Sequence, residues 1–196
     1  MPTAKIKSEV PMSLMDAIYK RRAVRSYTSQ KIDKATIQTL LDTAVHAPTA
    51  IHEEPWAFAI IQDNDILKIL SDKAKELIGD EIKTHAVSHQ LDHFTQADFN
   101  VFYNVGTLIV IYGKPLGPFV SADCWLAAEN LMLAACSMGL GTCVIGSAVS
   151  ALNTPEWKAN LKIPAEMTAI VPIIVGVPSG EVKPTPRKEP EILIWK

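Results

Sequence analysis

The stretch 121–138 constrains the fold most, because it has the length of a helix and is apolar on nearly every face. A helix that is hydrophobic all round has to be enclosed by other protein. Gly139 follows this stretch directly and is a typical helix stop. We therefore expect a central helix that is enclosed by protein.

Helices and strands alternate along the remainder of the chain. Ser13, with Asp16 three residues later, predicts the start of one helix, and Asp33 predicts the start of another that Pro48 ends. Further helices are expected at 66–78, closed by Gly79, within the polar and aromatic stretch 80–104, and after Thr154-Pro155. Strands are expected at 56–61, 107–112, 141–146 and 168–177, and Pro172 places the last of them at an edge or a bulge. The pattern favours a layered α/β or α+β sandwich.

Length, charge and cysteine content exclude several classes of protein. The 196 residues suit one compact domain or two small lobes, and a formal net charge of -2 argues against a nucleic-acid partner. The three cysteines lack CxxC spacing, so neither a disulfide scaffold nor a metal site is favoured. Residues 1–13 lack the apolar core of a secretory signal, and the apolar runs are too short to span a bilayer. We expect a cytoplasmic protein with no membrane partner.

The four arginines are unevenly distributed in a chain that contains 15 lysines. Arg21, Arg22 and Arg25 lie within five residues, and Arg187 lies in the proline-spaced tail beside Lys188. A guanidinium group grips phosphate bidentately, which lysine cannot do. Two interpretations stand. Arg21 and Arg22 carry the positive charge that is favourable at a helix C-terminus, or the arginines and Lys188 form an anion site.

Two further segments are rich in small residues. The connection 47–56 would let a planar ligand approach its backbone, although an ordinary loop explains it as well. In 139–146, glycines flank a short strand and leave the backbone accessible.

Together these segments resemble the nitroreductase family of flavoproteins, which bind FMN at a homodimer interface and use NADH or NADPH. The likeness runs from Met15 to Lys188. It rests on R-R-x-V-R-x-Y at 21–27, A-P-(S/T)-x-x-x-x-x-P-W at 47–56, G-L-G-x-x-x-I-G at 139–146, and V-G-V-P at 175–178 with the later basic pair. The resemblance implies an α+β three-layer sandwich, with a central, mostly antiparallel sheet flanked by helices, in an interlocked homodimer. Residues 1–196 would form a single domain whose extension, about 178–196, reaches the partner subunit.

The resemblance also implies which residues bind the cofactor. Arg21 and Arg22 would open the phosphate and ribityl site, and Arg187 and Lys188 would close it. Arg25 would face the pyrimidine edge of the flavin, where a cation stabilises the reduced ring. The ring contacts would come from two segments: Pro48, Thr49, Ala50 and His52 on one side, and Val144, Ile145 and Gly146, with backbone donors, on the other.

Three residues depart from the pattern that is usual in the family. Ala23 stands where serine is common, so one hydrogen bond to the flavin is expected to be absent. His52 and Glu54 replace asparagine and glutamine before the P-W pair, and a carboxylate near a reduced flavin is unfavourable unless it is protonated or turned away. The connection 114–120 is too short to hold the helical lid of larger relatives.

His85, His89 and His93 recur at helical spacing, and two imidazoles at i and i+4 can share a zinc ion. No glutamate or cysteine completes such a site nearby, so a polar helix face is the favoured interpretation. The sequence also lacks the hydrolase, Walker and Rossmann motifs.

We therefore expect an oxidoreductase in which FMN carries the chemistry and no side chain is catalytic. Electrons would pass by a ping-pong mechanism from NADH or NADPH to a small-molecule electron acceptor, such as a nitroaromatic compound or a quinone. The alternatives are reductive dehalogenation or flavin as substrate on the same fold, and a non-catalytic flavin-binding protein.

Overall fold

A four-stranded antiparallel sheet forms the centre of the computed structural model, which describes residues 12–85, 96 and 98–196. The strands lie in the order β1-β2-β4-β3. Their bounds are β1 Trp56–Ile61, β2 Leu108–Gly113, β3 Gly141–Val144 and β4 Thr168–Gly176. Each neighbouring pair is antiparallel, as the sequence resemblance implies.

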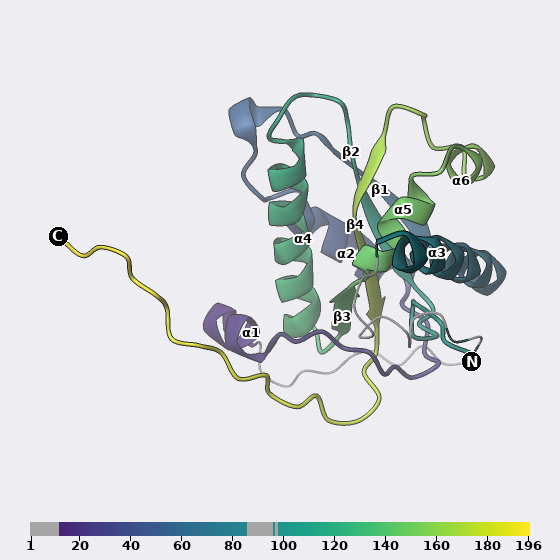
Figure 1. The fold of residues 1–196 in the computed structure, drawn as a ribbon. Helices are drawn as coiled ribbons and strands as arrows, with labels where there is room; N and C mark the ends of the chain where they lie inside the picture. The colour runs from purple at the N-terminus through teal and green to yellow at the C-terminus, as the bar shows by residue number, and fades with distance from the viewer. Residues whose placement is uncertain (1–11, 86–95, 97) are drawn as a thin grey trace.

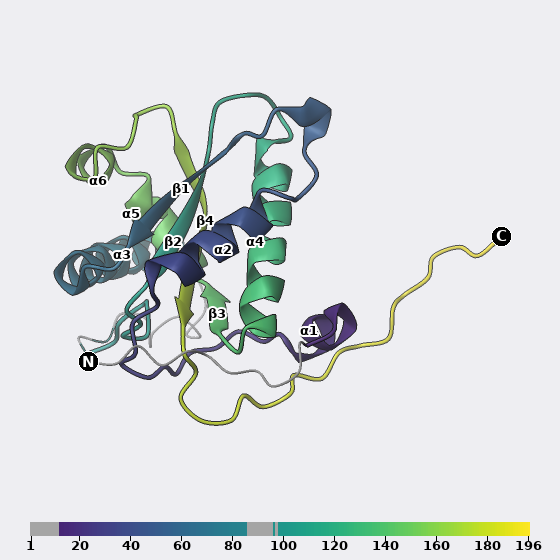
Figure 2. The same cartoon turned by 180° about the vertical axis from the view of Figure 1, so that it is seen from behind.

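Helices cover both faces of the sheet and produce three layers (Figures 1 and 2). On one face the core is completed by α2 (Lys34–Ala44) and α4 (Val120–Ser137). On the other it is completed by α3 (Asn64–His85) and α5 (Val149–Leu152). Every residue of β2 is buried, which explains the continuous apolar run in its sequence.

Local capping sequences set the helix starts. The hydroxyl of Ser13 accepts a hydrogen bond from the Asp16 amide at the start of α1 (Leu14–Lys20). The Asp33 carboxylate does the same for α2, and the Thr154 hydroxyl for α6 (Pro155–Asn160). Each side chain satisfies one of the helix's free amides. The described residues also form the short 3-10 turns η1 (Ala50–His52) and η3 (Gly146–Ala148).

The central helix α4 packs against the sheet, α1 and α2, but one of its faces stays uncovered. Its sheet-facing residues, among them Leu131 and Ala128, are completely buried. Trp125 and Leu126, on another side of the helix, are 46% and 47% exposed. One described chain therefore does not by itself supply the full enclosure by protein that is predicted for this helix, and an apolar strip of α4 stays open.

Two element predictions are also wrong. The third helix does not end at Gly79 but continues to His85. A glycine costs only about 1 kcal/mol inside a helix, which a long helix packed on the sheet tolerates. Residues 98–104 form turns rather than a helix, and His89 and His93 lie outside the described residues.

Pro172 does not mark an edge strand, because β4 pairs with both β2 and β3. The last residue of β3, Val144, pairs with Ile173, so the missing amide of Pro172 lies where pairing with β3 has ended. The alternative prediction of a bulge is confirmed nearby, where the register between β2 and β4 shifts at Ile111/Tyr112.

The C-terminal tail leaves the sheet at the end of β4 and extends away from the body of the molecule (Figures 1 and 2). Residues 192–195 expose apolar side chains, with Leu193 at 90% and Trp195 at 86%. Within the described part of the chain, no helix is both long enough and apolar enough to cross a membrane.

Candidate active site

Residues 21–27, which we call the arginine segment, lie along the edge of the sheet that β3 forms. Ala23 forms a parallel bridge with Thr142, and the Val24 amide donates to the Thr142 carbonyl at 2.9 Å. Further along, Tyr27 bridges Pro178 at the start of the tail. Residues 21–27 therefore lie against β3 on one side and the tail on the other.

Three consecutive cations line a small pocket of about 130 Å³ beside this edge. Its walls are Lys20, Arg21, Arg22, Val24, Cys136, Gly139, Leu140, Thr142, Pro178 and Val182. Burial raises the pKa of the Cys136 thiol, and the positive charges of Arg21, Lys20 and Arg22 oppose that rise. The pocket is thus electropositive.

The two arginines of the pocket differ in their contacts. Arg21 Nε lies 3.5 Å from Glu129 Oε1 of α4, and both side chains reach solvent. Arg22 Nη1 donates to the carbonyls of Tyr19 and Arg21 at 2.5 and 2.7 Å, so this group closes the C-terminus of α1. Arg22 Nε is buried and has no hydrogen-bond partner among the described residues. The helix-end interpretation therefore accounts for part of Arg22, and a polar atom remains for an anion to satisfy.

Arg25 lies over an aromatic ring, with its guanidinium carbon 6.0 Å from the centroid of Tyr103. It borders a second hollow with Tyr27, Tyr103, Asn100 and Asn104. Burial raises the pKa of the Cys143 thiol in β3, and the charges of Arg25 and Arg21 oppose the rise. Arg25 and Arg21 therefore act on the same stretch of β3.

Val144 is the last residue of β3, and Ile145 and Gly146 follow it directly. The Ile145 amide donates to the Pro172 carbonyl at 2.9 Å, so among the backbone donors expected from 144–146 this amide is already engaged within the chain. At Gly146 a Cβ atom would meet no atom of the described residues within 4 Å, so the backbone there is open to an approaching ring.

The loop that carries Pro48, Thr49, Ala50 and His52 lies elsewhere, at the start of α4. The Ala50 amide donates to both carboxylate oxygens of Asp123, at 3.2 and 3.3 Å. The turn that follows is tight: Ile51, His52 and Glu54 all have positive φ angles, of 47°, 58° and 47°. Ile51 is 83% exposed at its tip.

One chain keeps these two groups of residues apart, and we call them the basic half-site (residues 20–25 with 142–146) and the loop half-site (residues 48–52). Asp123 marks the loop half-site, and Cys136 lines the basic pocket. Thirteen residues of helix separate them, which is about 20 Å along the axis. Figures 1 and 2 both show η1 and α1 at opposite ends of α4.

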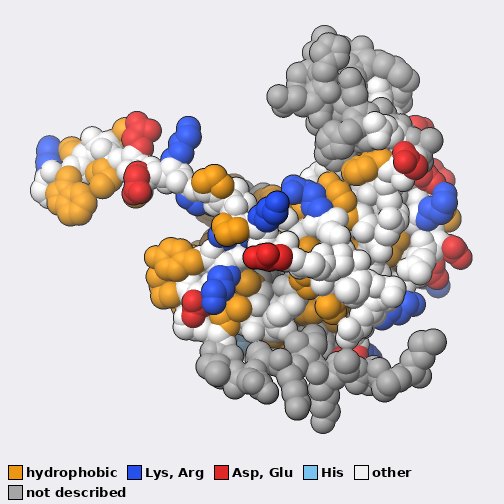
Figure 3. Space-filling view, turned by 90° about the horizontal axis from the view of Figure 1, so that it is seen from below, with side chains coloured by type: hydrophobic (Ala, Val, Ile, Leu, Met, Phe, Trp, Pro, Cys, Tyr) orange, Lys and Arg blue, Asp and Glu red, His pale blue; other side chains and the backbone are white. Residues whose placement is uncertain are grey.

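The tail begins beside the basic half-site. The Ser26 and Ser179 hydroxyls lie 2.6 Å apart, and Pro178 and Val182 line the basic pocket. Arg187 and Lys188 follow a few residues later and are exposed. Seen from below, Lys and Arg side chains gather near the point where the tail leaves the body (Figure 3). The described chain alone does not bring Arg187 onto Arg21.

Several residues of these half-sites escape prediction from the motifs, and Lys20, Tyr103, Asp123 and Glu129 are the clearest. A signal existed for two of them, because Asp123 and Glu129 are the only charged residues of the otherwise apolar helix α4. A charge in such a helix needs a partner, and both have one.

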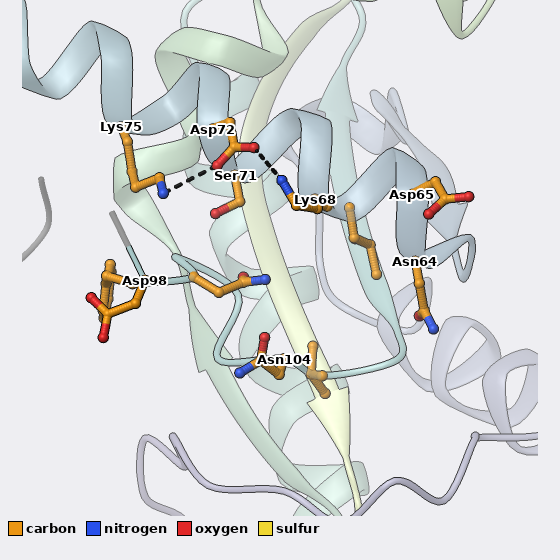
Figure 4. A pocket seen from close by; sticks show the side chains of 12 residues that line it. Asn64, Asp65, Lys68, Ser71, Asp72, Lys75, Asp98 and Asn104 are labelled. Atoms are coloured by element: carbon orange, nitrogen blue, oxygen red, sulfur yellow. Dashed lines mark hydrogen bonds and ion pairs between the residues drawn. The ribbon is translucent and has the colours of Figure 1, made fainter. Parts of the chain in front are cut away.

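A larger hollow of about 500 Å³ lies between α3 and residues 98–105 (Figure 4). Three of its charged groups are paired with one another, since Asp72 binds both Lys68 and Lys75, at 2.8 and 3.1 Å. Among the residues that the structure describes, no group of three His, Cys, Asp or Glu side chains could hold a metal ion.

Comparison with known proteins places this geometry in a family. The model of the nitroreductase family matches residues 18–176. A solved nitroreductase with bound FMN from Bacteroides fragilis superposes with a TM-score of 0.81 at 24% identity, covering 93% of this chain and 98% of the other. A protein of Archaeoglobus fulgidus with the provisional name NADH dehydrogenase/NAD(P)H nitroreductase is 26% identical over 84% of each chain. An iodotyrosine deiodinase of Thermotoga neapolitana is 22% identical over 90% of this chain and 94% of its own. The chain therefore belongs to the nitroreductase family.

Proposed function

We propose that the protein is an FMN-dependent oxidoreductase that passes electrons from NADH or NADPH to an electron-poor acceptor, such as a nitroaromatic compound or a quinone. The observation that carries the proposal is the basic pocket, where Lys20, Arg21 and Arg22 line one small cavity. Arg22 Nε is buried beside it and has no hydrogen-bond partner among the described residues. This donor set suits a phosphate ester, because guanidinium groups bind phosphate oxygens strongly. Membership of the family supports FMN as that ester.

We further propose that two copies of the chain complete each site. The basic half-site and the loop half-site lie at opposite ends of α4, so one chain cannot place both on one flavin ring. The apolar strip of α4 is open, and α1 exposes Leu14 and Tyr19 at 68% and 67%. Apolar surface of this kind is typical of an interface. A homodimer would cover it and bring the loop half-site of one copy to the basic half-site of the other.

The tail would contribute to the same assembly. Its apolar end, 192–195, has no covering surface in one chain, whereas a partner subunit offers one. Arg187 and Lys188 would then add charge to the phosphate site as the tail crosses the interface.

When bound, FMN would take a hydride from NADH or NADPH and then deliver electrons to the acceptor in the same position. The residues of the chain would bind and tune it. Arg21 and Arg22 Nε would hold the phosphate, and Arg25, already 6.0 Å from the Tyr103 ring, would set a positive charge near the pyrimidine edge. A fixed cation there favours the reduced, negatively charged ring.

Titration of the apoprotein with FMN, followed by flavin fluorescence, tests the phosphate assignment. Arg21→Ala and Arg187→Ala each remove one charge-assisted contact, so the Kd should rise about 10-fold to 100-fold. Glu129→Gln should act in the opposite direction and tighten binding about two- to fivefold, because it removes the carboxylate that Arg21 faces. Lys68→Ala is the control, since Lys68 pairs with Asp72 on α3 far from the pocket. Equal affinities in all four variants would remove the assignment.

Anaerobic addition of NADH or NADPH tests the reaction. The yellow holoprotein should lose its colour and recover it when a nitroaromatic compound or a quinone is added. Colour that NADH and NADPH leave unchanged would favour a non-catalytic flavin-binding protein, and a chain that takes up no FMN would refute the enzyme proposal.

Reductive dehalogenation is a second candidate, favoured by the relatives that are named iodotyrosine deiodinase. It is distinguished by incubating the chemically reduced holoprotein with iodotyrosine and measuring iodide. If iodide is released faster than a nitroaromatic compound is reduced, reductive dehalogenation becomes the preferred function.

A further inference from the structure

Asp123 is a buried carboxylate that the cofactor motifs do not include. It is only 4% exposed and lies in the first turn of α4. Its two oxygens lie 3.2 and 3.3 Å from the amide nitrogen of Ala50, a residue 73 positions earlier in the chain. It thus joins the central helix to the loop half-site.

Burying a carboxylate is unfavourable unless its lone pairs are satisfied. A carboxylate offers about four acceptor positions. Within the described residues, the Asp123 carboxylate accepts its hydrogen bonds from the Ala50 amide. Its position in the first turn adds the favourable field of the helix N-terminus. A leucine of similar size would pack there at lower cost, so the charge is explained best by its contact with the loop.

The loop needs such a contact because its backbone conformation is unfavourable. Ile51, His52 and Glu54 occupy the left-handed region, which is unfavourable for residues other than glycine. The Glu53 amide donates to the Ala50 carbonyl at 3.2 Å, so Ala50 is the first residue of this hydrogen-bonded turn. Holding the Ala50 amide therefore holds the start of the turn.

We propose that Asp123 is a positioning residue for the cofactor site: it fixes Thr49 and Ala50 in the conformation in which the loop half-site meets the flavin ring. This inference rests on the proposed function, because FMN is the ligand that the loop would meet. It also carries a specific consequence. The Ala50 amide is directed into the protein toward Asp123, so Ala50 contacts the ring through its methyl group and backbone surface and does not donate to it.

The test combines two measurements on the full-length protein. Hydrogen exchange of the Ala50 amide in the apoprotein reports the contact without any flavin, and FMN titration reports its effect on the site. In Asp123→Ala the Ala50 amide should exchange at least 10-fold faster and the Kd for FMN should rise about 10-fold. Asp123→Asn keeps an acceptor oxygen within reach, so it should restore most of both properties.

Asn130→Ala is the matched control, because Asn130 also ties α4 to another segment, through a 3.3 Å hydrogen bond to the Thr43 carbonyl. It should leave both the exchange of Ala50 and the Kd for FMN near the wild-type values. If Asp123→Ala does not fold, Asp123→Ser, which is too short to reach Ala50, takes its place with the same expected results.

The outcomes separate the two proposals. A wild-type chain that binds no FMN refutes the proposed function, while protection of the Ala50 amide that Asp123→Ala or Asp123→Ser abolishes still supports the contact. Fast exchange of Ala50 in the wild type overturns the contact. FMN affinity that is equal in wild type and Asp123→Ala overturns the positioning role, as does an equal loss in Asn130→Ala, which would indicate general destabilisation.

Discussion

Replacing Gly141 by alanine tests the packing that holds the arginine segment against the sheet. The new Cβ atom would lie 2.8, 2.8 and 2.9 Å from three side-chain carbons of Val24. Carbon atoms in contact are normally about 3.5–4.0 Å apart. Val24 is itself buried, and its Cβ is fixed to the backbone, so rotation of the side chain cannot relieve the clash. The backbone of the arginine segment has to move instead.

The size of the effect follows from two opposing terms. Overpacking of this kind costs about 1–3 kcal/mol, and displacement of Val24 also strains its 2.9 Å hydrogen bond to Thr142. Alanine lowers the entropy of the unfolded chain relative to glycine, which returns about 0.4–1 kcal/mol. We expect Gly141→Ala to lower the free energy of unfolding by about 1–2 kcal/mol. Because Val24 lies between Arg22 and Arg25, FMN affinity should fall as well.

Urea unfolding of the apoprotein and FMN titration measure the two effects. Gly106→Ala is the matched control, since among the described residues its new Cβ would meet only Lys31 Cγ within 4 Å, at an ordinary 3.8 Å. It should change the free energy of unfolding by less than about 0.5 kcal/mol. If Gly141→Ala proves as stable as Gly106→Ala and binds FMN as tightly as the wild type, the close attachment of this segment to β3 is refuted.

Two further predictions concern buried polar groups. The Tyr112 hydroxyl is buried and finds no hydrogen-bond partner among the described residues, so Tyr112→Phe should raise the free energy of unfolding by about 1 kcal/mol, and a loss of that size in urea unfolding would reveal a partner. Burial raises the pKa of Cys124 from 9.0 to about 11, with the charge of Asp123 adding to the rise. The folded chain then keeps this proton at a pH where the unfolded chain has lost it, so the stabilising contribution is complete below about pH 9 and disappears as the pH approaches 11. Unfolding curves at pH 8 and pH 10 should therefore differ more for the wild type than for Cys124→Ala, and equal differences would contradict the assignment.

The parts of the fold that the sequence predicts correctly depend on neighbouring residues. The bounds of β1 were predictable from an apolar run ending in a polar turn, and α6 from a threonine cap followed by proline. Where packing at a distance decides, local rules fail. Helix α3 continues through Gly79, and Pro172 lies in a central strand because β3 has already ended beside it.

The candidate site, like the fold, was predictable from the sequence only where it depends on neighbouring residues. The arginine cluster was recognisable from the sequence, because the chain has only four arginines beside 15 lysines and three of the four lie within five residues. Arg22 both closes the C-terminus of α1 and lines the basic pocket. The sequence does not predict this double role, because it depends on where the individual nitrogen atoms of the side chain lie. The sequence also could not indicate that the two half-sites lie at opposite ends of one helix, since that depends on how α1 and η1 pack on α4.

The two carboxylates of α4 connect the fold to this divided site. Asp123 faces inward and holds the loop half-site, and Glu129 faces outward and pairs with Arg21 of the basic half-site. Six residues of helix rotate the second carboxylate about 240° from the first and move it about 9 Å along the axis. An apolar helix is rigid once it is packed on a sheet, so the distance between the two half-sites is fixed by the length of α4. The helix that forms the core therefore also sets the geometry to which a second copy of the chain has to conform.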